Sequence, residues 1–402
     1  MNSEAKRCLL CQNAKCSKAC PVHTDVPTCM RLYREGKYVE AGKILFENNP
    51  LSALTSIVCD WDRFCYGNCI LNAKKEPVAW YEIEQELSQN FLKEYHPSKP
   101  KSNGHTVGII GSGPSGMVSA IKLAALGYEV TLYDRQKQMG GLLRYGIPAF
   151  RLDKKVVDEI ERVVLEYGIH FIGNIKVGKD ISLKDIRSKY EVTIIAIGAF
   201  KSRELKIPGE EMEHVLRAYD YLLAPEQYQL GEKVIVIGGG NVAMDAARTA
   251  KRARKEVSIF YRKTFENMPA NVREIEETKN EGVSFTTFVA PVKVKEKAVV
   301  FRKCENVIQE DGRVVTKILE GTDFEVPCDS LLIAAGEIVD YQIFDEKPEM
   351  DEWGWPITDA YGKTSFEDVY LTGDFLRGAS TIVQAVQNAK KTVQGIDAYL
   401  RG

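Results

Sequence analysis

Residues 106–116 read Thr-Val-Gly-Ile-Ile-Gly-Ser-Gly-Pro-Ser-Gly, an apolar stretch that runs directly into three closely spaced glycines. The segment MVSAIKLAALG that follows predicts a helix, and EVTLYD predicts a second strand ending at Asp134. Strand, glycine turn, helix, strand and acid in this order are typical of a dinucleotide-binding fold. We expect Gly111 to make the tight turn, Gly113 to let the backbone approach a pyrophosphate, and Gly116 to allow close helix–strand packing.

The helix after this turn should present its N-terminal N–H groups and its positive dipole end to phosphates. Asp134 should accept hydrogen bonds from a ribose. The site residues predicted for this first unit are Gly111, Gly113, Pro114, Ser115, Gly116 and Asp134.

The same pattern recurs in KVIVIGGGNVA (233–243), which leads into AMDAARTAKRA and then EVSIFYR. The second unit has Tyr261-Arg262-Lys263 where the first has its acid, and these cations can neutralise a ribose 2′-phosphate. We therefore predict FAD in the first unit and NADPH in the second, with NADH left open because NADH enzymes can also carry arginine nearby. The site residues predicted for the second unit are Gly238, Gly240, Asn241, Val242, Arg262 and Lys263.

Two apolar runs, 192–199 and 330–337, predict buried strands that end in small-residue turns. Residues 369–383 predict a third strand, an aspartate at its end and the start of a helix. This aspartate could hold the ribityl hydroxyls of a flavin, and the helix N-terminus could face the isoalloxazine. The chain is thus expected to return to the first unit, and these segments add Gly198, Gly336, Gly373, Asp374 and Thr381 to the predicted cofactor sites.

Eight of the ten cysteines lie in the first 69 residues. Four form the run Cys8-x2-Cys11-x4-Cys16-x3-Cys20-Pro21, three form Cys59-x5-Cys65-x3-Cys69, and Cys29 is left over. A Cys-Pro that closes such a run is characteristic of iron–sulfur ligation, and seven thiols with one further ligand would suffice for two 4Fe-4S clusters. A zinc site and a disulfide framework are the alternatives. Cys304 and Cys328 are interpreted as packing residues.

Composition restricts the possible partners and location. The formal net charge of −2, from 54 basic and 56 acidic residues, gives no basic surface for nucleic acid, and no apolar stretch approaches the length that spans a membrane. The start MNSEAKRCLL has no apolar signal segment, so we expect a reducing, cytoplasmic setting, which disfavours disulfides.

Together, the cysteine-rich segment and the motifs GSGPSG, GGLLRYGIPAFRL (140–152), GGGNVAMD, YRK-x4-MPA and LTGDFLRGAS resemble the family of the glutamate synthase small subunit. This family includes the electron-input portion of dihydropyrimidine dehydrogenase and the NADPH-binding subunit of electron-bifurcating transhydrogenases. The resemblance runs from about Cys8 to the C-terminus. It implies an α/β fold with a helical iron–sulfur domain (1–98), an FAD domain (104–225 and 328–402) and an inserted NAD(P)H domain (226–327), both Rossmann-like.

The resemblance also implies individual ligands. One 4Fe-4S cluster would use Cys8, Cys11, Cys16 and Cys69. The other would use Cys20, Cys59, Cys65 and Glu84, and the flavin site would gain Gly141, Leu142 and Arg151. Two departures from the family pattern are Asp60, where proline is usual, and Asp134, which is shorter than the usual glutamate.

The function implied is electron input. NADPH would deliver hydride to FAD, and the clusters would relay single electrons to a larger catalytic subunit or a ferredoxin-like carrier. Hydride transfer demands no proton-transfer residue, so no catalytic side chain is predicted. The alternatives are a flavoprotein with a structural zinc head, a redox-sensing binding protein without turnover, and an NADH-dependent input subunit of a dihydropyrimidine dehydrogenase-like complex. A disulfide reductase is disfavoured because no close cysteine pair lies near either dinucleotide unit.

Overall fold

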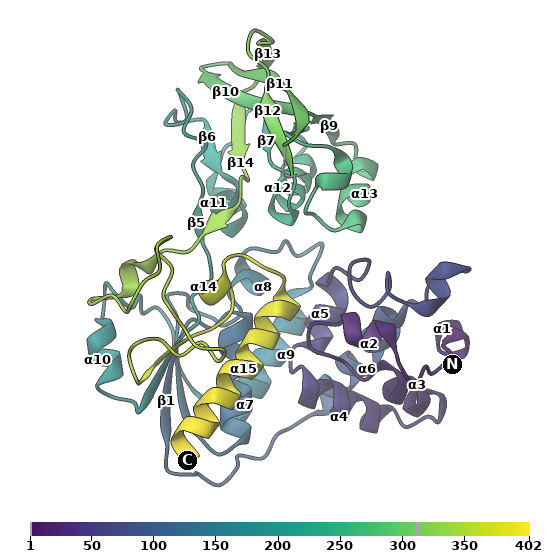
Figure 1. Cartoon of the computed structure of the whole chain (residues 1–402), viewed down its shortest axis with the longest axis vertical. Helices are drawn as coiled ribbons and strands as arrows, with labels where there is room; N and C mark the ends of the chain where they lie inside the picture. Colours follow the sequence, from purple (N-terminus) through teal and green to yellow (C-terminus); the bar gives the residue numbers. More distant parts are fainter. Residues whose placement is uncertain (1, 310–312) are drawn as a thin grey trace. The chain divides into compact units, whose positions relative to one another are not determined.

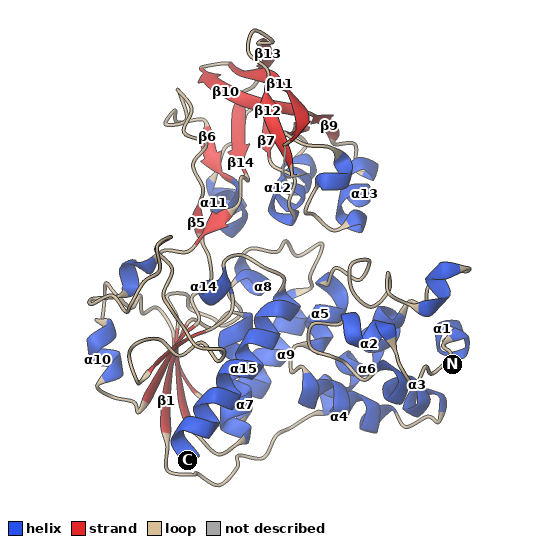
Figure 2. Cartoon of the chain, in the orientation of Figure 1, coloured by secondary structure: helices blue, strands red, loops and turns tan. Residues whose placement is uncertain are grey.

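The structure, a computed structural model, describes residues 2–309 and 313–402 of the chain. The chain divides into two compact units, each built from segments that are distant in sequence. Unit 1 comprises residues 1–144, 149–199 and 339–402, and unit 2 comprises residues 145–148 and 200–338. Figure 1 follows the path of the chain through both units, and Figure 2 distinguishes their helices from their strands.

Unit 1 contains a five-stranded parallel sheet with the strand order β16-β4-β1-β2-β3. The strands are β1 (Thr106–Ile110), β2 (Glu129–Tyr133), β3 (His170–Ile172), β4 (Val192–Ile195) and β16 (Val369–Leu371). The central strands β1 and β4 are almost completely buried, as expected of a parallel sheet that helices cover on both faces. β16 pairs with β4 although unit 2 lies between them in the sequence.

Helices cover both faces of this sheet, with α10 on one side and α7 and α15 on the other (Figure 2). α15 packs along α7, and it begins with a capping box in which Thr381 and Gln384 each accept a hydrogen bond from the other's backbone N–H. The helical segments here are α7 (Pro114–Ala125), α8 (Leu142–Tyr145), α9 (Lys154–Glu166), α10 (Leu183–Arg187), α14 (Asp374–Arg377), α15 (Ile382–Arg401) and the 3-10 turn η4 (Tyr341–Ile343).

Residues 2–95 form a helical part of unit 1 that we call the head. Its helices are α1 (Ser3–Arg7), α2 (Lys15–Ala19), α3 (Val26–Arg34), α4 (Tyr38–Asn48), α5 (Ser52–Val58), the 3-10 helix η1 (Ile70–Ala73) and α6 (Trp80–Glu94). Met30, Leu45, Ile83 and Leu87 are fully buried in its core. The Arg34 guanidinium donates to the carbonyl oxygens of Ala5 and Cys8 and so fixes the start of the cysteine run on α3.

Unit 2 contains a second five-stranded parallel sheet, with the order β6-β14-β7-β8-β9. The strands are β6 (Val215–Arg217), β7 (Lys233–Ile237), β8 (Glu256–Tyr261), β9 (Ser284–Thr287) and β14 (Ser330–Ile333). The helical segments are α11 (Ala218–Leu223), η2 (Pro225–Gln227), α12 (Asn241–Arg252), η3 (Phe265–Asn267) and α13 (Val272–Asn280).

Unit 2 also contains antiparallel strands that the sequence patterns do not predict. β10 (Val289–Lys295), β11 (Ala298–Ile308), β12 (Val314–Ile318) and β13 (Phe324–Pro327) form one sheet, in which both β10 and β13 pair with β11. β5 (Lys201–Ser202) and β15 (Glu337–Ile338) form a separate two-stranded ribbon.

The predicted α/β class is confirmed, and the runs 192–199 and 330–337 do contain the buried strands β4 and β14. The three domain boundaries stay a prediction. No helix of the described residues is both long enough and apolar enough to cross a membrane.

Candidate functional site

The glycine turn between β1 and α7 has the geometry that a dinucleotide phosphate requires. Gly111 has φ +102°, and a Cβ there would lie 2.5 Å from the carbonyl oxygen of Ala196, the residue directly after the neighbouring strand β4. A Cβ on Gly116 would lie 1.8 Å from the carbonyl oxygen of Gly111, so the helix can pack on the turn only without a side chain. A Cβ on Gly113, by contrast, would meet nothing within 4 Å. Gly113 caps α7, so the open face of the turn coincides with the positive end of the helix dipole.

Asp134 is engaged by the turn itself. Its Oδ2 accepts hydrogen bonds from the backbone N–H and the hydroxyl of Ser112, both at 2.6 Å, and its Oδ1 accepts from the backbone N–H of Gln136 at 2.8 Å. A carboxylate offers about four lone-pair sites, so roughly one is left for a ribose hydroxyl. Ser112 was not among the predicted site residues, and only its place between two turn glycines could have pointed to it.

Two further predicted segments reach the same turn. A Cβ on Gly141, just before Leu142 at the start of α8, would lie 2.8 Å from the Cα of Gly113. Gly373 has φ +62°, and a Cβ there would lie 2.4 Å from the hydroxyl oxygen of Ser115 in the first turn of α7. The return segment after β16 therefore lies against the first glycine turn, although it is distant in sequence.

The remaining residues predicted for the cofactor sites are spread over both units. Asp374 accepts hydrogen bonds from the backbone N–H and the hydroxyl of Ser380, just before Thr381 caps α15. Gly198 follows β4, and Arg151 follows α8. Gly336 belongs to unit 2, where its carbonyl accepts from the backbone N–H of Arg203.

The second glycine turn, in unit 2, is built in the same way. A Cβ on Gly238 would lie 2.3 Å from the carbonyl oxygen of Ala334, and Gly240 caps α12 with an ordinary φ of −91°. Asn241, which precedes Val242 in the first turn of α12, accepts a hydrogen bond from the backbone N–H of Asn271 at 3.0 Å. The segment before α13 is thereby held against the turn.

Arg262 and Lys263 directly follow the last residue of β8, with Arg262 exposed and Lys263 half-buried. In a parallel sheet of this kind the ribose of a bound dinucleotide lies at this strand end. The hydroxyl of Tyr261 donates to the carbonyl of Asn267 at 2.8 Å, so Tyr261 is held by the loop.

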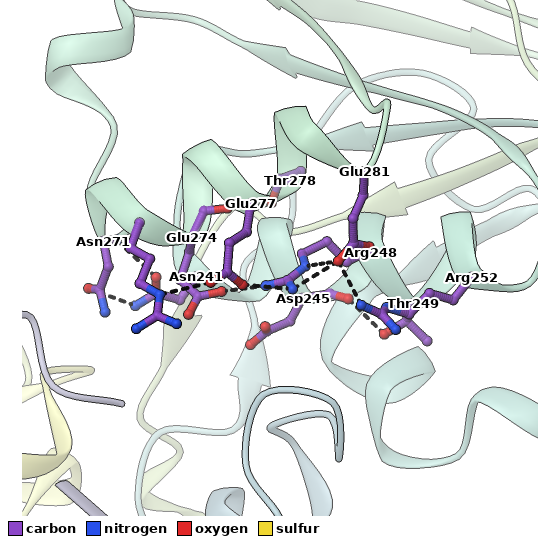
Figure 3. A network of polar contacts seen from close by, with 11 residues as sticks. Asn241, Asp245, Arg248, Thr249, Arg252, Asn271, Glu274, Glu277, Thr278 and Glu281 are labelled. Carbon is purple, nitrogen blue, oxygen red and sulfur yellow. Dashed lines mark hydrogen bonds and ion pairs between the residues drawn. The ribbon is translucent and has the colours of Figure 1, made fainter. Parts of the chain in front are cut away.

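A buried arginine, which no sequence motif indicates, joins helices α12 and α13 beside the second glycine turn. The Arg248 side chain on α12 is only 4% exposed, and it forms ion pairs with Glu274, Glu277 and Glu281 at 2.7, 2.8 and 2.9 Å. Figure 3 shows these three glutamates lining one side of α13, with Asn271 at its beginning and Asn241 opposite. The network fixes α13 on α12 and so supports the polar contact at the turn. Its carboxylates recur at the spacing of ordinary helical surface charges, so nothing in the sequence distinguishes them.

The head contains two neighbouring cavities, and each is lined by one of the ligand groups that the family resemblance implied. Cys8, Cys11, Cys16 and Cys69 line the first cavity. Cys20, Cys59, Cys65 and Glu84 line the second. Cys65 also reaches the wall of the first, together with Val26 and Trp80, so the cavities share one wall. Cys29 is fully buried and lines neither cavity.

The electrostatics of these cavities fit a group that carries positive charge. Burial raises the pKa of the Cys16 thiol to about 11 and of the Glu84 carboxyl to about 8, so both would be neutral unless a metal compensated their anions. Leu10, between Cys8 and Cys11, has φ +50°, a strained conformation for a non-glycine residue that bends the loop around the first cavity.

The ligands of a 4Fe-4S cluster bind different irons and surround a larger space than the four ligands of a structural zinc ion, which meet at one point. Among residues 2–309 and 313–402, no group of three or more histidine, cysteine or acidic side chains converges closely enough to hold one metal ion.

The two cavities differ in what lies next to them. Val383 of α15, two residues after Thr381, lines the second cavity. The first cavity is lined by Leu9 and Ile70, whose exposures of 62% and 50% mark where it reaches the surface. In Figure 1, α1, which directly precedes this cysteine loop, lies at the end of the head away from α15. The second cavity thus lies against the start of α15, and the first cavity reaches the surface of the head.

Comparisons with known proteins cover the whole chain. Residues 105–391 match the family model described as pyridine nucleotide-disulphide oxidoreductase, and residues 1–95 match the model described as dihydropyrimidine dehydrogenase domain II, 4Fe-4S cluster. The glutamate synthase [NADPH] small chain of Azospirillum brasilense is 33% identical over 431 residues, which cover 100% of this chain and 89% of that protein.

A relative with another printed name is nearly as similar. The NAD-dependent dihydropyrimidine dehydrogenase subunit PreT homolog of Salmonella typhi is 31% identical over 99% of this chain and 94% of its own length. Among solved structures, Mycobacterium tuberculosis FprA in complex with NADPH superimposes with a TM-score of 0.66 at 21% identity, over 74% of this chain and 84% of that one. This last likeness concerns the fold alone.

Proposed function

Because the chain belongs to the pyridine nucleotide-disulphide oxidoreductase family and matches glutamate synthase small chains over its whole length, we propose that it is the electron-input subunit of a larger enzyme. It is an NAD(P)H-dependent iron–sulfur flavoprotein oxidoreductase. When bound, FAD takes up a hydride and releases single electrons, which 4Fe-4S clusters can accept. We assign FAD to the glycine turn of residues 111–116, NADPH to that of residues 238–242, and one cluster to each cavity of the head.

The observation that carries this proposal is that the predicted flavin segment, the second cavity and the first cavity adjoin one another in unit 1. The flavin segment Gly373–Thr381 leads into α15, Val383 of α15 lines the second cavity, and that cavity shares a wall with the first. Electrons would therefore pass first to the cavity of Cys20, Cys59, Cys65 and Glu84 and then to that of Cys8, Cys11, Cys16 and Cys69. The chain's residues bind and orient the groups, and no side chain is needed to move a proton at the hydride step.

Metal and flavin analysis of anaerobically prepared protein tests this assignment. We expect one FAD and about eight irons per chain, with absorption that bleaches when NADPH is added. Stoichiometric zinc without iron would support the zinc-head alternative instead. If the protein contains iron and FAD but neither NADPH nor NADH bleaches its absorption, it would be a redox sensor without turnover.

We further propose that NADPH is preferred, because Arg262 and Lys263 lie at the strand end where a 2′-phosphate would bind. An NADH-dependent input subunit is the second candidate, favoured by the printed name of the Salmonella relative and by the exposure of Arg262. The domain boundaries and a cytoplasmic location remain part of this proposal.

Replacing Arg262 by alanine should weaken NADPH far more than NADH. Loss of charge-assisted bonds to a 2′-phosphate costs about 1.5–3 kcal/mol, or roughly tenfold to a hundredfold in affinity. The measurement is steady-state reduction of an artificial acceptor by both nucleotides, with Lys255→Ala as the control because Lys255 lies before β8, at its opposite end. The assignment of Arg262 to a 2′-phosphate would be wrong if the parent chain already prefers NADH. It would also be wrong if Arg262→Ala weakened the affinity for both nucleotides equally.

We also propose that the partner docks where the first cavity reaches the surface. Exposed Leu9, Ile70 and Lys15 line this cavity, and two further exposed lysines, Lys74 and Lys75, follow Ile70 after the short helix η1. No ion pair of the described residues involves these three lysines. An apolar centre with a cationic rim complements an acidic protein surface. The partner would be an acidic electron-accepting subunit or ferredoxin-like carrier.

Reversing two of these charges, in the variant Lys15→Glu/Lys74→Glu, should lower the affinity for an acidic plant-type ferredoxin about tenfold at low salt. The difference should shrink as salt rises, because rim charges are screened. Lys391→Glu on α15 is the control, since Lys391 is also exposed but lies outside the head. Unchanged binding by the double variant would place the docking surface elsewhere.

A further inference from the structure

Two lysines connect the flavin-binding part of unit 1 to the head. The Lys390 ammonium on α15 donates to Oδ1 of Asn48 at 2.6 Å and to the carbonyl oxygen of Val22 at 3.4 Å. The Lys122 ammonium on α7 donates to the carbonyl oxygen of Glu47 at 2.6 Å. All three acceptors belong to the head, and both lysines are half-buried. The helices that carry the flavin site are thus tied to the head by cations.

Lys390 flanks the second cavity. Val383 lines that cavity, and Lys390 lies seven residues further along α15, about two turns on and therefore on the same face. Val22, whose carbonyl Lys390 contacts, also lines the cavity and lies two residues after the predicted ligand Cys20. The ammonium is therefore held beside the space that the second cluster would occupy.

Within residues 2–309 and 313–402, neither lysine forms an ion pair with a carboxylate, and each contacts only neutral oxygens of the head. The nearby Glu47 nevertheless attracts Lys122, and Cys20 lies close enough to Lys390 to oppose the lowering of its pKa by burial. Burial lowers the pKa of both ammonium groups, and repulsion from Lys390 adds to this for Lys122, whose pKa falls to about 8. Two half-buried cations side by side are unfavourable unless an anion lies close. The predicted cluster with three thiolates and a carboxylate supplies that anion.

We propose that Lys390 is a positioning residue that raises the reduction potential of the second cluster and makes it a better acceptor for electrons from the flavin. The inference rests on the proposed function, because it requires a cluster in the cavity of Cys20, Cys59, Cys65 and Glu84. An added electron makes a negatively charged cluster more negative, and a fixed positive charge beside it stabilises that state. Cluster potentials respond to nearby charge in this way.

The test is potentiometric titration, followed by electron paramagnetic resonance, of anaerobically prepared full-length protein. In Lys390→Gln we expect the midpoint potential of one cluster to fall while that of the other changes much less. Lys390→Met should lower the same midpoint potential, although methionine cannot make the hydrogen bonds that glutamine can keep. If one of the two neutral variants is unstable, the other still tests the effect of the charge. Lys390→Arg keeps the charge and should keep the parent potential. Lys391→Gln, one residue along and exposed, controls for loss of a distant surface charge.

The outcomes separate this inference from the proposed function. If both neutral variants contain both clusters at parental potentials, Lys390 serves only as a tie between helices and the inference is overturned. A potential that falls equally in Lys390→Arg would also overturn it, because the effect would then follow from altered packing. If the parent protein contains no second cluster, the proposed function itself fails at that cavity, whatever the variants do.

Discussion

Replacing Gly113 by valine is expected to abolish retention of FAD and leave the fold intact. Gly113 has a φ of −70°, which valine adopts readily, and a Cβ there would meet no atom of the protein within 4 Å. The branched side chain would instead fill the space over the N-terminus of α7, where the pyrophosphate should lie. A clash of this kind costs about 3 kcal/mol or more, or at least a hundredfold in affinity. Flavin content of the purified protein and a thermal unfolding scan are the measurements.

Gly240→Val is the matched control, since Gly240 caps α12 as Gly113 caps α7, and its Cβ would come no closer than 3.9 Å to Pro269. This variant should keep its FAD and lose affinity for NADPH. Gly116→Val should behave differently from both, because its Cβ would overlap the carbonyl oxygen of Gly111 and the unit should fail to fold. Normal FAD occupancy in folded Gly113→Val would show that the flavin binds elsewhere.

The second large effect is expected from Cys16→Ser. Cys16 lines the first cavity, and serine is a poor substitute for a thiolate ligand, so the iron content should fall from about eight to about four per chain. The head should also unfold at a lower temperature, because the core of a domain this small is supplemented by its metal groups. Iron analysis and circular dichroism on anaerobic samples measure the two effects.

Cys29→Ala separates ligation from packing. Cys29 is more deeply buried than Cys16 but lines neither cavity, and burial raises the pKa of its thiol to about 12. Alanine preserves an apolar side chain there, and the full iron content should remain. Loss of four irons from Cys29→Ala, or their retention in Cys16→Ser, would contradict the assignment of cysteines to the cavities.

The family, the α/β class and the oxidoreductase function could be read from the sequence because each depends on short local patterns. A glycine turn between an apolar strand and a helix has few structural alternatives, and cysteines in runs seldom serve packing. The assignment of the individual cofactor and cluster ligands remains a prediction, although the structure brings the two implied ligand groups to two cavities.

The features that the sequence could not predict are contacts between residues that lie far apart along the chain. The contact of Lys390 with Asn48 spans 342 positions, and neither residue belongs to a motif. Arg248 has the appearance of an ordinary helical surface cation until α13 is packed on α12. The sequence does not predict the sheet of β10–β13. Its alternating polar and apolar residues are compatible with strands in many folds, and no local pattern determines which strands pair.

The return of β16 to the sheet of unit 1 has a consequence for how the protein folds during synthesis. The sheet lacks its edge strand β16, and the flavin segment lacks Gly373, until the ribosome has made all of unit 2. Closing so long a flexible loop would be entropically unfavourable, but the ribbon of β5 and β15 joins the two chain segments at which unit 2 begins and ends. Once unit 2 has folded around that ribbon, the loop that remains between β4 and β16 is much shorter than the whole of unit 2. The nucleotide-binding unit should therefore complete its fold before the flavin site can form, so that an incomplete chain would hold no flavin to react with oxygen.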